Sequence, residues 1–207
     1  MNESGNRKTA YVNGTLIALN VLYFLYLEIA GSSEDITFML NHGAMFAPLV
    51  LQDGQYYRLL TSMFMHFGIR HLINNMLILF VIGDNLERAI GKIRYLILYL
   101  FCGIGANVIS MFFGIKDYGR VVGAGASGAI FGVVGALLIV VVKNQGRLED
   151  LHSRQLVMMI LFSLYIGFTS TGVDNVAHVA GLILGMFFAL IVYRTPRRTR
   201  PDDVWEM

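Results

Sequence analysis

The chain has 207 residues, of which 56% are apolar and 14% are charged, and its formal net charge is +2. Soluble domains usually carry about 25% charged and about 45–50% apolar residues, so this composition excludes an ordinary soluble globule and predicts a membrane-embedded protein. The small, scattered positive charge does not indicate nucleic acid as a partner. The single cysteine, Cys102, excludes an intramolecular disulfide framework and a cysteine-rich metal site.

Six apolar segments approach the roughly 20 residues that a helix needs to cross a bilayer. They are expected near 10–30, 69–87, 93–113, 127–142, 154–172 and 175–193. Charged or turn-forming residues separate consecutive segments, and no polar linker or repeat divides the chain. The sequence therefore predicts an all-α fold, a polytopic bundle of six transmembrane helices that forms one membrane domain over 1–207.

The first segment also has the flanks of a cleaved signal peptide, since Arg7 and Lys8 precede it and small residues follow it. Its polar residues Asn13, Asn20 and Glu28 make a poor signal core. We therefore expect the first segment to remain as a transmembrane helix.

The basic residues indicate the orientation of the six spans. Twelve of the sixteen fall on the side that holds both ends of the chain. These are Arg7, Lys8, Arg88, Lys92, Arg94, Lys143, Arg147, Arg154, Arg194, Arg197, Arg198 and Arg200. The other four are Arg58, Arg70, Lys116 and Arg120. Under the positive-inside rule both termini are cytoplasmic, and the tail over 195–207 is expected to be a short solvated end.

A long connection over 31–68 joins the first two spans on the outer side, and it is too long to be a simple connector. Its sequence is semi-apolar, and it carries Tyr56 and Tyr57. The loop is expected either to be partly embedded in the outer leaflet, with its tyrosines at headgroup level, or to rest on the bundle.

Strongly polar side chains inside spans are costly and mark functional-site candidates. Four stand out: His71 and Asn75 in the second span, Ser127 at the start of the fourth, and His178 near the start of the sixth. These three spans run in the same direction. Ser127 and His178 each lie 16 residues before the first inner charge of their helix, which is about 24 Å at 1.5 Å per residue. By the same rise the other two lie about 20 to 26 Å above their inner charge, so all four share one layer near the outer face.

The four side chains supply the groups that acyl transfer requires. His178 can take the proton of the Ser127 hydroxyl, and His71 and Asn75, one turn apart, can donate hydrogen bonds to an oxyanion. Each residue also has a structural alternative. Ser127 could be an N-cap, His178 a buried structural donor and Asn75 an interhelical hydrogen-bonding group.

Two neighbouring residues are left without a catalytic role. Asp174, four residues before His178, is expected to cap the sixth helix. His66, near the mouth of the layer, is expected to contact substrate or only the interface.

Three motifs in register with the six spans resemble the rhomboid intramembrane serine proteases. Gly125-Ala126-Ser127-Gly128 matches GxSG, His71 through Asn75 matches HxxxN, and 177–185 matches AHxxGxxxG. Tyr57-Arg58 stands where the family usually has Trp-Arg. The resemblance runs from about Tyr11 to Arg194 and departs from the usual pattern at Tyr57.

The resemblance implies a serine endopeptidase that cleaves transmembrane protein substrates with a dyad of Ser127 and His178. His71, Asn75 and the Ser127 backbone N–H would form the oxyanion hole, and Phe131 would pack on the histidine. No cofactor or metal is expected, and a bacterial plasma membrane is the expected location. The oligomeric state is left open.

Entry of the substrate is expected beside the fifth span, where Phe162, Tyr165 and Phe168 would form a gate. Two other functions use the same features differently. One is a non-catalytic rhomboid-like factor that binds or escorts membrane proteins, and the other is a small transporter, disfavoured because no inverted repeat with broken helices is evident.

Overall fold

The computed structural model describes residues 10–114, 121–148, 151–169 and 172–195. The expectations for Lys116 and Arg120 and for most of the tail lie outside the described residues. Each of the six predicted apolar segments is helical for most or all of its length. The helices are α1 (Tyr11–Ala30), α5 (Gly68–Ile78) continued by the π-helical η2 (Leu79–Gly83) and by α6 (Asp84–Ile90), α7 (Lys92–Gly114), α8 (Ser127–Lys143), α9 (Ser153–Thr169) and α10 (Asn175–Val192).

Length and apolar composition qualify three described helices to cross a membrane. They are Tyr11–Ala30, Lys92–Phe113 and Asn175–Val192. A fourth candidate is the bent pair Arg58–Phe64 and Gly68–Ile90, which meet at 89°. The helices α8 and α9 are apolar but shorter. The chain is therefore a helical, multi-pass membrane protein.

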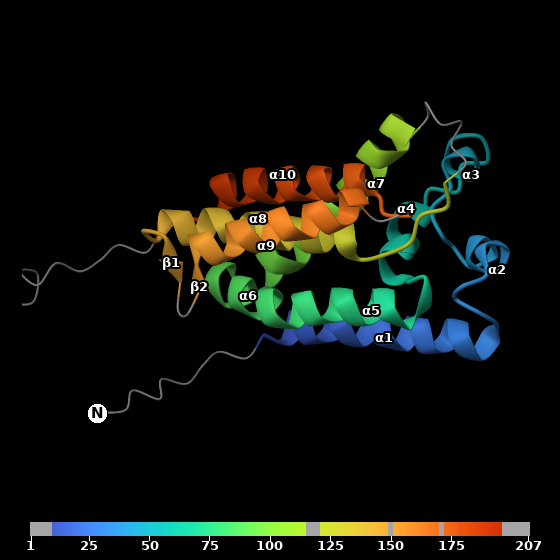
Figure 1. Cartoon of the computed structure of the whole chain (residues 1–207), viewed down its shortest axis with the longest axis horizontal. Helices are drawn as coiled ribbons and strands as arrows, with labels where there is room; N and C mark the ends of the chain where they lie inside the picture. Colours follow the sequence, from blue (N-terminus) through green and yellow to red (C-terminus); the bar gives the residue numbers. More distant parts are fainter. Residues whose placement is uncertain (1–9, 115–120, 149–150, 170–171, 196–207) are drawn as a thin grey trace, which may run out of the picture.

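The helix α8 forms the centre of the bundle. Its sequence is apolar all round, which is typical of a helix that is surrounded by others. Twelve of its residues, between Gly128 and Val141, are buried. The helices α7 and α10 pack against it and against each other, and in Figure 1 α9 and α10 run alongside α8. The helix that begins with Ser127 is thus the best-enclosed element of the fold.

Glycines bring the backbones of α8 and α10 into direct contact. A Cβ atom added to Gly181 would overlap the carbonyl oxygen of Gly128, and one added to Gly185 would overlap that of Gly132. A Cβ added to Gly135 would likewise overlap the carbonyl oxygen of Leu182. Small residues at i and i+4 permit this approach in membrane helices, and the seam fixes the position of α10 relative to α8.

A buried polar cluster joins α1 to the helices that follow it. The Glu87 carboxylate accepts hydrogen bonds from the backbone N–H groups of Val12 (3.1 Å) and Asn13 (2.7 Å) in the first turn of α1. Asn13 Nδ2 donates to the carbonyl of Leu79 (3.0 Å) at the start of the π-helical turn, and Tyr95 Oη donates to Asn13 Oδ1 (2.7 Å). These bonds explain how the buried polar side chains of Asn13 and Glu87 are accommodated inside the bundle.

The long connection after α1 folds into short helices at one end of the bundle (Figure 1). They are α2 (Ile36–Asn41), α3 (Ala47–Leu51), α4 (Arg58–Thr61) and the 3-10 turn η1 (Ser62–Phe64). Arg58 is buried and donates from Nη1 to the carbonyls of Leu40 (2.7 Å) and Ala44 (2.8 Å). Its Nε donates to Gln55 (2.8 Å), so one side chain ties three parts of the connection together.

At the opposite end, two short antiparallel strands connect α8 to α9. They are β1 (Arg147–Leu148) and β2 (Leu151–His152), with Arg147 opposite His152. This pair is a small addition to the all-α fold that the sequence predicts.

Candidate active site

Ser127 is the first residue of α8. The N-cap position belongs to Ala126, and no side chain caps the helix. Ser127 is half-buried and lies inside the helix, one position after the N-cap, so it does not take the N-cap role of the structural alternative. The first backbone N–H groups of a helix have no partner within the helix and carry the positive end of its dipole. A negative oxygen near Ser127 would therefore meet a favourable field.

Gly125 places Ser127 next to His71. Its φ of +143° is a conformation that side-chain-bearing residues rarely adopt. A Cβ atom at this position would lie 2.8 Å from Cε1 of His71 and 3.7 Å from Oγ of Ser127. The side chains of His71 and Ser127 thus approach the same point beside Gly125, although they come from α5 and α8.

Ser62 and Asn107, which are not among the residues predicted for the site, hold the segment before Ser127 in place. The backbone N–H of Gly125 donates to the Ser62 carbonyl (2.9 Å), and Asn107 Nδ2 donates to Ser62 Oγ (3.0 Å) and to the carbonyl of Leu59 (2.9 Å). Asn107 did carry a signal, because it is a strongly polar residue inside an apolar span. Ser62 has no such sequence signal, since the group that binds Gly125 is its backbone carbonyl.

His178 lies one turn inside α10 and is buried. Its ring stacks on Phe131 with centroids 4.3 Å apart and an interplanar angle of 17°, so the expected aromatic contact is confirmed. The residues next to the two candidates are also close together. Gly128 follows Ser127 and Ala177 precedes His178, and a Cβ atom added to Gly128 would lie 3.8 Å from the carbonyl oxygen of Ala177. Serine and histidine therefore stand at the same level of the α8–α10 seam.

The described residues show no hydrogen bond between Ser127 and His178. Nδ1 of His178 is buried and has no partner among them. Catalytic hydrogen bonds are often long in a substrate-free site and tighten when substrate binds.

Asn75 and His66 complete the polar layer. Asn75, one turn after His71 on α5, is buried, and its Nδ2 has no hydrogen-bond partner among the described residues. His66, directly before α5, is completely buried and packs edge-on against His71 with ring centroids 5.0 Å apart. His66 is thus buried behind His71, while Asn75 keeps a free donor.

Asp174 caps α10, as the sequence predicts. Its Oδ1 accepts a hydrogen bond from the backbone N–H of Ala177 (2.9 Å), and its Oδ2 accepts one from Ser110. The carboxylate is engaged at the helix end and at α7, which supports leaving it out of the candidate catalytic set.

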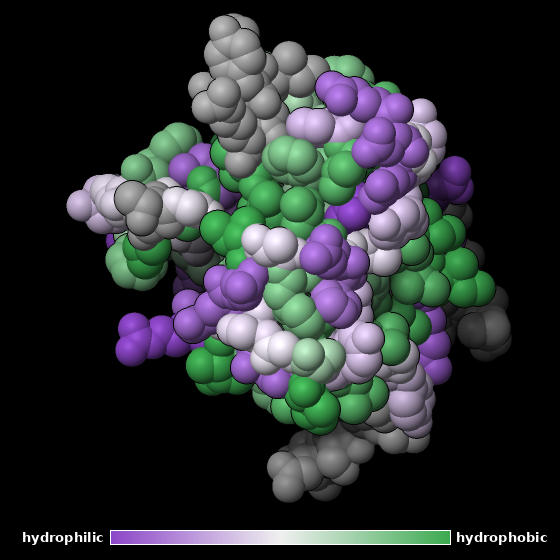
Figure 2. All heavy atoms as spheres, turned by 90° about the vertical axis from the view of Figure 1, so that its right-hand side faces the viewer, coloured by the Kyte–Doolittle hydropathy of each residue, from purple (hydrophilic) through white to green (hydrophobic). Residues whose placement is uncertain are grey.

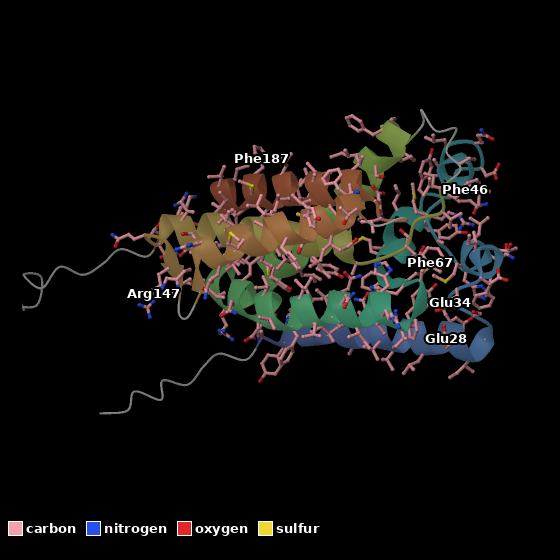
Figure 3. All side chains as sticks on the ribbon, in the orientation of Figure 1. Glu28, Glu34, Phe46, Phe67, Arg147 and Phe187 are labelled. Carbon is pink, nitrogen blue, oxygen red and sulfur yellow. The ribbon has the colours of Figure 1, made fainter. Side chains whose placement is uncertain are left out.

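The end of the bundle with α2 and α3 carries hydrophilic and hydrophobic side chains side by side. Figure 2 looks onto this end and shows a band of hydrophilic side chains flanked by hydrophobic ones. Figure 3 shows Glu28, Glu34 and Phe46 at the same end. On α9, the expected gate residues Phe162, Tyr165 and Phe168 are each about two thirds exposed, at 65%, 66% and 68%. The hydrophilic band lies at the end of the bundle that carries the polar layer, and the three aromatic side chains of α9 lie on its outer surface.

Comparison with known proteins identifies the family. A family model described as "Rhomboid domain" matches residues 53–195, which is more than half of the chain. Rhomboid protease GluP of Bacillus subtilis (strain 168) is 39% identical over 173 residues, covering 84% of this chain and 33% of that protein. Rhomboid protease AarA of Providencia stuartii is 32% identical over 209 residues, covering 90% of this chain and 74% of that protein.

A plant relative extends the comparison. RHOMBOID-like protein 5 of Arabidopsis thaliana is 34% identical over 150 residues, covering 72% of this chain and 48% of that protein. The chain therefore spans about a third of GluP, three quarters of AarA and half of the plant protein. On the extent of the domain match and these identities, the chain belongs to the rhomboid family, whose matched bacterial members are named as proteases.

Proposed function

We propose that the protein is an intramembrane serine endopeptidase that cleaves transmembrane protein substrates. The observation that carries the proposal is the convergence at the start of α8. Ser127 shares the space beside Gly125 with His71, and the neighbouring helix α10 carries His178 stacked on Phe131. A nucleophile, a base and oxyanion donors in one layer are the parts that peptide hydrolysis requires.

In the first half of the reaction, Ser127 Oγ attacks the carbonyl carbon of the scissile peptide bond and His178 accepts the hydroxyl proton. The carbonyl oxygen becomes an oxyanion, which His71, Asn75 Nδ2 and the backbone N–H of Ser127 stabilise. When the C–N bond breaks, His178 returns its proton to the leaving amine. Water then attacks the acyl-enzyme through the same base, which releases the acid and restores the serine.

The supporting contacts suit these roles. The Phe131 ring holds the plane of His178 fixed, so the base is preorganised, and the dipole of α8 favours the developing charge. Asn75 Nδ2 is buried and has no partner among the described residues. Leaving a buried donor unpaired costs about 1–3 kcal/mol, and an oxyanion would recover that cost in the transition state.

We infer six spans with both termini cytoplasmic, and a dyad near the outer face of a bacterial plasma membrane. The excess of basic residues at the end with Lys143 and Arg194 supports this orientation. A peptide bond in a transmembrane helix is hydrogen-bonded and dry, so the substrate helix must unwind locally, and a polar pocket close to one face can bring water to it. The exposed aromatic residues of α9 would gate its access.

A cleavage assay separates the protease from a binding or escort factor with the same fold. Purified protein is incubated with a single-span model substrate, alongside Ser127→Ala, His178→Ala and the control Ser153→Ala at the far end of the bundle. We expect cleavage by wild type and by the control, and none by the two dyad variants. Substrate binding without cleavage in all four proteins would favour the escort function.

A further inference from the structure

A pocket at the end of the bundle opposite Ser127 has no part in the proposed chemistry. It has a volume of about 410 Å³ and is lined by Ala89, Arg94, Ile191, Val192, Tyr193 and Arg194. It therefore lies between the end of α6, the first turn of α7 and the end of α10. His178 precedes Arg194 by 16 residues on α10 and the segment just after it, so the pocket lies about 24 Å from the candidate active site along the helix.

The charge of the pocket is positive. Arg94 and Arg194 are exposed, and within the described part of the chain neither has a hydrogen-bond or ion-pair partner. No lining residue is acidic. The first turn of the 23-residue α7 adds the positive end of a helix dipole close to Arg94. Guanidinium groups that have no partner among the described residues can bind a phosphate bidentately.

The apolar surroundings indicate what carries the phosphate. Beside the pocket on α10, Phe187, Leu190 and the lining residue Ile191 are exposed to 57%, 54% and 64%. Figure 3 shows Phe187 on the outer side of α10, away from the bundle. Apolar side chains exposed on a membrane helix face lipid chains. The pocket therefore lies at the boundary between the exposed apolar side chains and the arginines, which is the level expected for lipid headgroups.

We propose that this pocket binds the phosphate headgroup of an anionic phospholipid from the cytoplasmic leaflet. Arg94 and Arg194 hold the phosphate from two sides, and the acyl chains lie along the exposed face of α10. Basic pockets between transmembrane helices on the cytoplasmic side bind anionic headgroups in this way. The bound lipid would link the start of α7 to the end of α10, both of which pack against the helix of Ser127.

Native mass spectrometry of the full chain tests the proposal. The protein is released from nanodiscs of phosphatidylcholine and phosphatidylglycerol, and the retained phosphatidylglycerol is counted. Each of Arg94→Gln and Arg194→Gln is expected to weaken retention about fivefold, and the double variant about thirtyfold, because each basic group near a membrane surface contributes a factor of this size. The control Arg154→Gln removes an exposed arginine that does not line the pocket and should retain lipid like wild type.

Two results would overturn the proposal. One is equal retention by wild type and the double variant when both have the same unfolding midpoint. The other is retention of added inorganic phosphate by wild type with no retention of phosphatidylglycerol, which would assign the pocket to a free anion. The readout is lipid binding, so it is independent of the proposed protease activity.

Discussion

The seam between α8 and α10 leads to the most specific prediction of the fold. In Gly181→Ala, the new methyl group overlaps the Gly128 carbonyl oxygen and lies 3.0 Å from its carbonyl carbon. The methyl carbon would lie 2.0 Å from that oxygen. Backbone atoms cannot rotate away, so the helices must separate by about 1.5 Å to restore an ordinary contact distance of about 3.5 Å. Overpacking of this kind lowers the unfolding free energy by about 1–3 kcal/mol, and the better helix propensity of alanine offsets up to about 1 kcal/mol of that loss.

The same displacement acts on the candidate dyad, because Gly181 lies one turn after His178 and Gly128 directly follows Ser127. A misplacement of about 1 Å between reacting groups can lower a rate about 100-fold. We expect Gly181→Ala to lose about 1–2 kcal/mol of unfolding free energy in a mixed-micelle denaturant titration, from the balance of those two terms. Its cleavage rate should fall by one to two orders of magnitude, which is about 1.4 kcal/mol of activation free energy per order.

Gly14→Ala is the matched control, since a Cβ on this α1 glycine meets no atom within 4 Å. The control should be unchanged or up to about 1 kcal/mol more stable, because alanine is the better helix former. If Gly181→Ala matches Gly14→Ala in stability and retains full cleavage, the backbone contact does not position the dyad and the reasoning is refuted.

Three further substitutions test other parts of the structure. Gly125→Ala forces a side chain into the positive-φ region and against His71. The substitution should lower the unfolding free energy by about 1–2 kcal/mol and the cleavage rate at least tenfold. Full activity would contradict the role of this turn. Arg58→Lys loses the hydrogen bonds of the guanidinium to the carbonyls of Leu40 and Ala44 and should lower the unfolding free energy by about 1.5–3 kcal/mol. An unchanged midpoint of thermal unfolding would show that these bonds do not hold the connection. Glu87→Ala removes the acceptor of two backbone N–H groups in the first turn of α1 and should lower the unfolding free energy by about 2 kcal/mol. Hydrogen exchange at that turn should become faster, and unchanged exchange would contradict the role of Glu87.

The helices and their packing seam could be predicted from the sequence. Hydropathy located all six apolar helices, because a helix in lipid needs a long apolar run. Gly181 and Gly185 lie one turn apart, a spacing that permits close contact between membrane helices, and the structure shows that contact on backbone atoms. The capping role of Asp174 was also predictable, since Asp followed by Asn is a typical helix start.

The folded connection over 31–68 could not be predicted in the same way. Its order depends on Arg58, which binds carbonyls 14 and 18 residues earlier in the chain, and no local pattern indicates such a bond. The contribution of Ser62 to the site is likewise a backbone carbonyl that accepts from Gly125. The π-helical turn at Leu79, whose carbonyl binds Asn13, also has no sequence signal.

The central claim is that the hydroxyl of Ser127 is an activated nucleophile, and covalent labelling tests it most directly. A fluorophosphonate reacts with an activated serine, which forms a phosphorus–oxygen bond as fluoride leaves. We predict labelling of wild type on the peptide that contains Ser127, with none in Ser127→Ala and strongly slowed labelling in His178→Ala. A folded wild-type protein that remains unlabelled, or labelling at another serine that persists in Ser127→Ala, would contradict the account.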